Sequence, residues 1–90
     1  MQAIWKFPLV ITDEQTVAMP RGSAIMCVQN QKQGEDETLC LWARVDINAP
    51  PEPRRILIYG TGHQHDEIEG IYIGTAQQFG GRGVWHVFEG

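Results

Sequence analysis

The chain has 90 residues and a net charge of −4, with 42 % hydrophobic and 20 % charged residues. This length predicts one domain, residues 1–90, whose small core leaves little room for a deep enclosed active site. The acidic balance argues against binding of a nucleic acid polymer, and no apolar run approaches the roughly 18 residues of a membrane span.

Short apolar runs alternate with turn residues along the first third of the chain, which is the pattern of β-strands. The expected strands are residues 3–10 (AIWKFPLV), 15–20 (QTVAMP) and 23–31 (SAIMCVQNQ). Pro8 favours an edge position or an early end for the first strand. Thr12 and Gln15 have the spacing of a capping box, so a helix of about two turns over residues 12–19 is an alternative to the second strand.

The middle of the chain carries the clearest alternation. After a polar hairpin loop centred on Gly34, residues 38–46 (TLCLWARVD) place Leu39, Leu41, Ala43 and Val45 on one face and Cys40, Trp42, Arg44 and Asp46 on the other. Such period-two alternation predicts a strand with one buried face. The following residues 47–53 (INAPPEP) are interpreted as a stiff surface loop.

The last third contains eight of the ten glycines, and its apolar runs end at glycine. Residues 54–62 (RRILIYGTG) are apolar on both faces, which favours a central strand. Two more strands are expected at 70–78 and 83–89, and residues 63–70 have room for one helical turn. The sequence therefore predicts an all-β, mainly antiparallel fold of five to seven short strands, arranged as a small sandwich or barrel with at most one short helix.

Few residues have the pattern of a catalytic site. Cys27 and Cys40 each lie inside an apolar run, so both are expected to be buried, reduced thiols without a disulfide. Ser23 is the only serine and has no nucleophile motif around it, and a thiol paired with His86 would be buried. We therefore expect no enzyme activity and no cofactor.

The loop after residue 62 contains His63, His65 and Asp66, which together with His86 are groups able to hold a divalent metal. Catalytic metal sites normally draw their ligands from well-separated segments. A solvated polar loop is therefore the favoured interpretation, and no metal site is predicted.

The segment Tyr59–Gly60–Thr61–Gly62–His63 suggests an anion site instead. Two glycines flank Thr61, and such backbone can form a nest of N–H groups around a phosphate or carboxylate. The Thr61 hydroxyl can donate a hydrogen bond, and His63 can add charge or stacking. The pattern matches no Walker or Rossmann motif, because no βαβ unit surrounds it.

Arginines beside aromatic residues extend this candidate site, since stacking and bidentate pairing serve a nucleotide's base and phosphate together. Arg44 shares a strand face with Trp42, and Arg82 lies among glycines, whereas Arg54 and Arg55 are better explained by surface ion pairs. One of Trp5, Trp42 or Trp85 is expected to cover an oligomer interface or a ligand base. The predicted ligand-binding residues are Trp42, Arg44, Tyr59, Gly60, Thr61, Gly62, His63 and Arg82.

Six motifs taken in order, IWKFPL, MPRGSAIMCVQ, LCLWARVD, GTGH, YIGT and HVFE, resemble a family of small phage-encoded proteins classed as a domain of unknown function. The resemblance covers nearly the whole chain. The chain departs from the family's pattern in the insert QKQGEDE and in HQHDEIEG, where a shorter loop is expected. The second departure argues against an essential role for His65 and Asp66.

The resemblance implies a phage accessory protein in the cytoplasm of the bacterial host, where such proteins often blunt host defence. We expect a homo-oligomer that binds a small anionic nucleotide ligand, a cyclic nucleotide or ADP-ribose derivative used as an immune signal, and sequesters it without cleavage. The alternative is a protein-binding inhibitor of a host defence effector or nuclease. The carboxylates are too dispersed for a nucleic-acid mimic.

Overall fold

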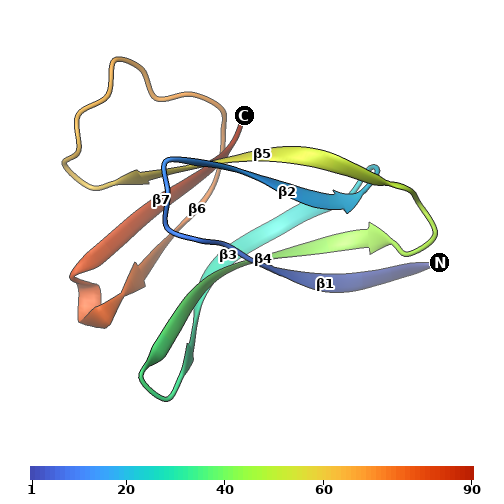
Figure 1. The fold of residues 1–90 in the computed structure, drawn as a ribbon, viewed down its shortest axis with the longest axis horizontal. Coiled ribbons are helices and arrows are strands. Elements are labelled where there is room, and N and C mark those ends of the chain that lie inside the picture. Colours follow the sequence, from blue (N-terminus) through green and yellow to red (C-terminus); the bar gives the residue numbers. More distant parts are fainter.

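The computed structural model describes all 90 residues and confirms an all-β fold of antiparallel strands. The chain forms seven strands and a single 3₁₀ turn, and Figure 1 shows how the strands are arranged. In chain order they are β1 (Gln2–Pro8), β2 (Glu14–Pro20), β3 (Ala24–Gln33), β4 (Asp36–Asp46), β5 (Pro51–Gly60), β6 (Ile71–Gln78), η1 (Phe79–Gly81) and β7 (Gly83–Glu89).

The strands form two sheets. The first has the order β1-β4-β3, and the second has the order β2-β5-β7-β6. The Cα atoms extend over 40 × 36 × 16 Å. The shortest dimension suits two stacked sheets, which pack roughly 10 Å apart. The molecule is therefore a flat β-sandwich.

The core lies between the sheets and follows the predicted alternation of β4. Leu39, Leu41, Ala43 and Val45 are all at most 1 % exposed, and they face the second sheet. That sheet contributes Met19, Ile56, Ile58, Ala76 and Val87 to the same cluster. Cys40, Trp42 and Arg44 alternate with the core residues of β4, so they lie on the outer face of the first sheet, where Cys40 is nevertheless buried.

The two sheets approach most closely where β3 crosses β6. A Cβ atom on Gly74 would lie 2.9 Å from Cγ1 of Val28, so this crossing requires a glycine. Each strand carries a register shift beside the crossing, at Met26 in β3 and at Ile73 in β6. β-bulges bend strands and increase their twist, which brings the two edges together without a hydrogen-bonded ladder.

β5 is the central strand that its apolar residues predict, because it pairs with β2 on one side and β7 on the other. The expected surface loop is too long, however, since β5 begins at Pro51. Pro51 and Pro53 pair only with β2, and the β7 ladder starts at Ile56. Proline is tolerated at these two positions because the β7 side of β5 has no partner strand there, so no N–H is needed on that side.

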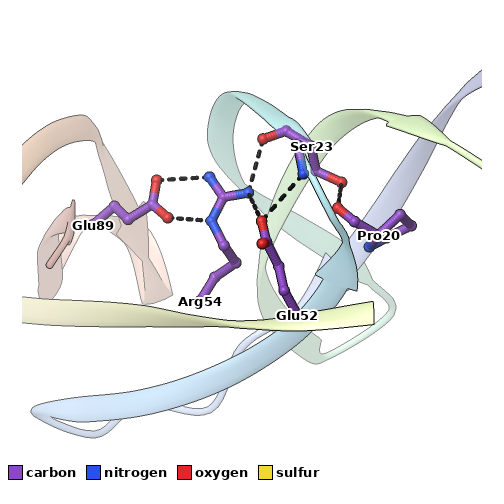
Figure 2. Close-up of polar contacts among 6 residues, drawn as sticks. Pro20, Ser23, Glu52, Arg54 and Glu89 are labelled. Carbon is purple, nitrogen blue, oxygen red and sulfur yellow. Dashed lines mark hydrogen bonds and ion pairs between the residues drawn. The ribbon is translucent and has the colours of Figure 1, made fainter. Parts of the chain in front are cut away.

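Arg54 joins three segments at one end of this sandwich, as Figure 2 shows. Its guanidinium donates two hydrogen bonds to the Glu89 carboxylate, one of them 2.9 Å long, and one of 2.8 Å to the carbonyl of Ser23. Its side chain is 16 % exposed. Pairing with Glu89 raises the pKa of Arg54 above its usual value. The surface ion pair expected for Arg54 is thus a half-buried clamp.

Several local expectations are settled by the structure. The segment with the capping-box spacing is strand β2, and residues 63–70 form an irregular loop with no helical turn. Both cysteines are free thiols; Cys40 is buried as expected, whereas Cys27 is only partly buried. None of the elements is a helix with the length and hydropathy needed to cross a membrane.

Candidate functional site

The segment Gly60–His63 is a tight turn at the end of β5. The His63 N–H donates to the Gly60 carbonyl over 3.2 Å, and Gly62 has φ +81°. These two features define a type II β-turn with Thr61 and Gly62 at its centre. Gly62 is required because the third turn position needs a positive φ, which L side chains rarely adopt.

The turn does not form the predicted nest of free N–H groups. The Thr61 N–H donates to the carbonyl of Val84 over 3.2 Å, and the His63 N–H closes the turn itself. Backbone donors already used in this way cannot surround an anion. Of the N–H groups of residues 61–63 only that of Gly62 has no acceptor, so a nest of several N–H groups is absent and an anion at this turn would be met mainly by side chains.

Gly60 has a different role from the one expected. A Cβ atom at this position would lie 2.7 Å from Cε1 and 2.8 Å from Nδ1 of His63. The imidazole therefore occupies the space that a side chain on residue 60 would fill. Glycine at this position packs the His63 ring against the end of β5.

Arg82 lies beside this turn, as the anion hypothesis requires. It lines a cavity of about 280 Å³ together with Gly60, Thr61, His63 and Trp85. Its side chain is exposed and has no ion pair or hydrogen bond within the chain. A cation without a partner beside a hydroxyl and an imidazole can pair with a phosphate or carboxylate.

A second cavity adjoins the first and shares Gly60, Thr61 and His63 with it. Its volume is about 330 Å³, and its other walls are mostly aromatic. They are Tyr59, Gly62, Ile68, Tyr72, His86 and Phe88. Phe88 makes edge contacts with Tyr59 and Tyr72, each with ring centroids 5.4 Å apart. Such a surface suits a planar ring.

Four polar side chains form a continuous hydrogen-bonded chain along the same face. The Tyr72 hydroxyl is 2.6 Å from Oγ1 of Thr75, which is 2.9 Å from Nδ1 of His86. Nε2 of His86 is in turn 2.7 Å from Oγ1 of Thr61. Both ring nitrogens of His86 are thus bonded to hydroxyl groups, and neither faces a carboxylate.

The series Thr61, His86 and Thr75 has the geometry of a catalytic triad, in which a nucleophile, a base and an orienting group follow one another. It differs from such a triad in the charge of the orienting group. A serine-protease triad uses a buried aspartate behind the imidazole to stabilise the imidazolium that forms during attack. Here the orienting group is the neutral hydroxyl of Thr75. The arrangement is therefore better suited to orienting the Thr61 hydroxyl toward a bound group than to activating it as a nucleophile.

The loop of residues 61–70 folds over the outer face of the second sheet. The Glu69 N–H donates to the Tyr59 hydroxyl over 3.1 Å. The His65 ring meets the Tyr59 ring edge-on, with the two ring centroids 4.8 Å apart. Arg55 pairs with Glu14 and Glu69 at the surface, as predicted, and this pairing raises its pKa. Leu57, which is only 4 % exposed, lines a cavity together with His65 and Glu69 of this loop.

The largest cavity lies on the other side of this loop and has the wrong charge for an anion. Its volume is about 390 Å³, and it is lined by five carboxylates: Asp13, Glu14, Asp66, Glu67 and Glu69. No three histidine, cysteine or acidic side chains converge in a geometry that would hold a metal ion. His65 and Asp66 line this acidic cavity, whereas His63 and His86 line the aromatic one.

Trp42 and Arg44 lie away from the turn. Both are on the outer face of the first sheet, and neither lines a cavity that contains Thr61, His63 or Arg82. Within one chain, the structure therefore brings together Tyr59, Gly60, Thr61, Gly62, His63 and Arg82 but not Trp42 or Arg44. A different arginine and tryptophan, Arg82 and Trp85, line one cavity together.

Sequence reasoning missed the residues behind the turn. The sequence pattern places Thr75, Tyr72 and Phe88 only in strands, and it suggests His86 only for metal binding or catalysis. The period-two pattern of β7 does place His86 and Phe88 on one face, opposite the core residue Val87. That signal identifies the face but not its hydrogen-bond partners, which come from β6 and the turn.

Comparison with known proteins identifies one family, whose function is unknown. No curated protein and no solved structure matches the chain significantly. A domain of unknown function, DUF7352, matches it over residues 1–90, its full length. The chain therefore belongs to the DUF7352 family.

Proposed function

We propose that this protein binds a small nucleotide-type anion at the Gly60–His63 turn and holds it without cleaving it. The observation that supports this proposal is the unpartnered Arg82 beside Thr61 and His63, in a cavity that adjoins an aromatic one. A nucleotide combines an anion with a planar ring, so its two parts match the two cavities. The volumes of about 280 and 330 Å³ suit groups of that size.

The biological setting that we propose is phage counter-defence. The motifs resemble those of phage-encoded accessory proteins, and such proteins act inside the bacterial host. In that setting the ligand is an immune signal, a cyclic nucleotide or an ADP-ribose derivative, and the protein lowers its free concentration. The chemistry at the turn favours sequestration over hydrolysis, because His86 lacks a carboxylate partner.

The proposal is tested by incubating the purified protein with a panel of cyclic nucleotides and ADP-ribose derivatives. The free signal is measured after filtration, and the bound fraction is released by heat and analysed by mass spectrometry. We expect depletion of at least one signal and its recovery intact. Recovery of a shortened or opened product would identify an enzyme, and a panel with no depleted member would exclude sequestration of these signals.

A homo-oligomer is part of the proposal, because a second copy can supply the side chains that one chain leaves elsewhere. Arg44 is exposed and unpaired, and Trp42 is only partly buried. Light scattering measures the subunit number. If a partner subunit completes the site, Arg44→Ala weakens ligand binding without changing the fold. If one chain is sufficient, this variant binds the ligand like the wild type.

The second candidate is inhibition of a host defence effector or nuclease by direct contact. It is favoured by apolar side chains on the first sheet, where Ile4 is 60 % exposed and Met26 is 56 % exposed. Ile4 pairs with Arg44, and Met26 lies in the bulge beside the Trp42 pair. A pull-down from host lysate tests this candidate, and an Ile4→Glu variant that still recovers the same protein would contradict a contact through this face.

A further inference from the structure

We infer that Thr75 and the Tyr72 hydroxyl act through His86 to make the Thr61 hydroxyl a hydrogen-bond donor toward an anionic ligand oxygen. The inference rests on the proposed function, because it describes how that same site addresses its ligand. It is carried by the unbroken chain of contacts from Tyr72 to Thr61, whose lengths are 2.6, 2.9 and 2.7 Å. Thr75 lines none of the cavities, so its contribution is positional.

The hydrogen-bonded chain of four side chains has two self-consistent arrangements of its protons when His86 is neutral. If Nδ1 carries the proton, it donates to Thr75, and Thr61 must donate to Nε2. Thr61 then offers only lone pairs to the cavity and repels an anion. If Nε2 carries the proton, it donates to Thr61, and the Thr61 proton is free to point into the cavity. The tautomer of His86 thus decides whether Thr61 accepts or donates.

The Tyr72 end of the hydrogen-bonded chain favours the second arrangement, in which Nε2 of His86 carries the proton. Tyr72 bears a phenol, which is more acidic than an aliphatic alcohol and therefore the stronger donor to Thr75. Once Tyr72 donates to Thr75, the Thr75 proton goes to Nδ1, and the remaining imidazole proton sits on Nε2. The Thr61 hydroxyl is then oriented as a donor before any ligand arrives, and an oxyanion reinforces that direction.

Orientation of this kind lowers the cost of binding because no group has to reorganise. Thr61 also lies between the two cavities, since it lines both. A donor at this position can meet an anionic oxygen of a ligand whose ring lies in the aromatic cavity. Arg82, which lines the first of these cavities, supplies the charge. The hydrogen-bonded chain therefore adds direction to a site whose charge comes from the arginine.

Three variants test the inference with inorganic phosphate and adenosine monophosphate as the probes. Tyr72→Phe removes the phenol but keeps the ring, Thr75→Val removes the bridging hydroxyl, and Thr75→Ser restores it. Thr16→Val is the matched control, because Thr16 is an exposed strand residue with no hydrogen-bond partner for its side chain. Affinities are measured by calorimetry. The tautomer is read from the ¹⁵N resonances of His86 at about pH 8.5, where an ordinary imidazole is neutral.

We expect the wild type to carry its proton on Nε2 and to keep it there when the probe binds. Thr75→Val should weaken binding about fivefold and Tyr72→Phe about threefold, the range of a single hydrogen bond. Both variants should increase the share of the Nδ1 tautomer, while Thr75→Ser and Thr16→Val match the wild type.

The two proposals fail in different ways. A wild type that binds neither probe overturns the anion site together with this inference. Binding accompanied by an Nδ1 proton in the wild type, or equal affinities in Thr75→Val and Thr75→Ser, overturns the inference alone and leaves the proposed function standing.

Discussion

Gly60→Ala separates the role of the turn in binding from its role in folding. The new Cβ would lie 2.7 Å from Cε1 of His63, whereas an ordinary contact is at least about 3.4 Å. The ring must therefore move by roughly 0.7 Å or swing out of the site. The His63 side chain is exposed, so this movement costs little folding energy.

The magnitudes follow from the same geometry. Gly60 has an ordinary φ, and replacing a strand glycine by alanine returns about 0.5–1 kcal/mol of backbone entropy. We therefore expect the free energy of unfolding to change by less than about 1 kcal/mol. Displacing His63 removes one polar contact with the ligand, so affinity should fall about fivefold, or roughly 1 kcal/mol.

The assay is a double-mutant cycle with Gly60→Ala, His63→Ala and the double variant, using thermal unfolding for stability and calorimetry for the ligand found in the panel. If Gly60 acts by positioning His63, the double variant binds no more weakly than His63→Ala. Additive losses of affinity would show that Gly60 contributes independently, and a Gly60→Ala variant with wild-type affinity would refute the role of the His63 ring.

The remaining predictions concern stability and thiol chemistry. Gly74→Ala should lower the free energy of unfolding by about 1–3 kcal/mol, measured by urea denaturation, because its Cβ meets buried Val28 at the crossing of the sheets; an unchanged midpoint would contradict that close packing. Arg54→Ala should cost about 2–4 kcal/mol in the same assay, since Glu89 and the Ser23 carbonyl lose their partner; a loss below about 0.5 kcal/mol would mean that the clamp is only a surface pair. Burial raises the pKa of the Cys40 thiol, so iodoacetamide should label the partly exposed Cys27 first in peptide mapping, and preferential labelling of Cys40 would contradict its burial.

The same pKa shift has a consequence at alkaline pH. The folded state holds the Cys40 proton more tightly than the unfolded chain does, so the unfolded state loses it first as pH rises. Stability from this group is therefore complete below the ordinary thiol pKa and decreases above it, from about pH 8.5 to 9 upward. Urea midpoints across this range should fall less in Cys40→Ala than in the wild type.

The alternation of apolar and polar residues was sufficient to predict the strands and the buried face of β4. Leu39, Leu41, Ala43 and Val45 repeat with period two, and burial of that face is the only way to remove them from water together. The start of β5 was harder to predict, because Pro51 and Pro53 are compatible with a strand only where one side lacks a partner.

The hydrogen-bonded chain could not be predicted from spacing. Tyr72 and Thr75 are three residues apart, and in a regular strand they would point to opposite faces. The bulge at Ile73 shifts the register, so Tyr72 pairs with Phe88 and Thr75 pairs with His86 on the same outer face. A sequence pattern with period two assigns these two residues to different sides of the sheet, and only the register shows that they meet.

The structure confirms a sharp turn at Gly60–His63 but not a nest of free N–H groups, and the ligand site there stays a prediction. Glycines around Thr61 did mark a sharp turn beside an arginine, because Gly62 has the positive φ that the turn requires. The N–H groups of Thr61 and His63, however, are bonded to the carbonyls of Val84 and Gly60. Local sequence cannot show this, since the carbonyl of Val84 comes from a strand more than twenty positions away in the chain.

The central claim is that Arg82 pairs with the anionic part of a bound nucleotide. Arg21 provides a matched control, because it is also an exposed arginine in a turn without an ion pair, and it lines none of the cavities. The decisive measurement is the calorimetric affinity of Arg82→Ala and Arg21→Ala for the signal that the wild type depletes. We predict a roughly tenfold loss, about 1.4 kcal/mol, for Arg82→Ala and none for Arg21→Ala. Equal affinities in the two variants would contradict this claim.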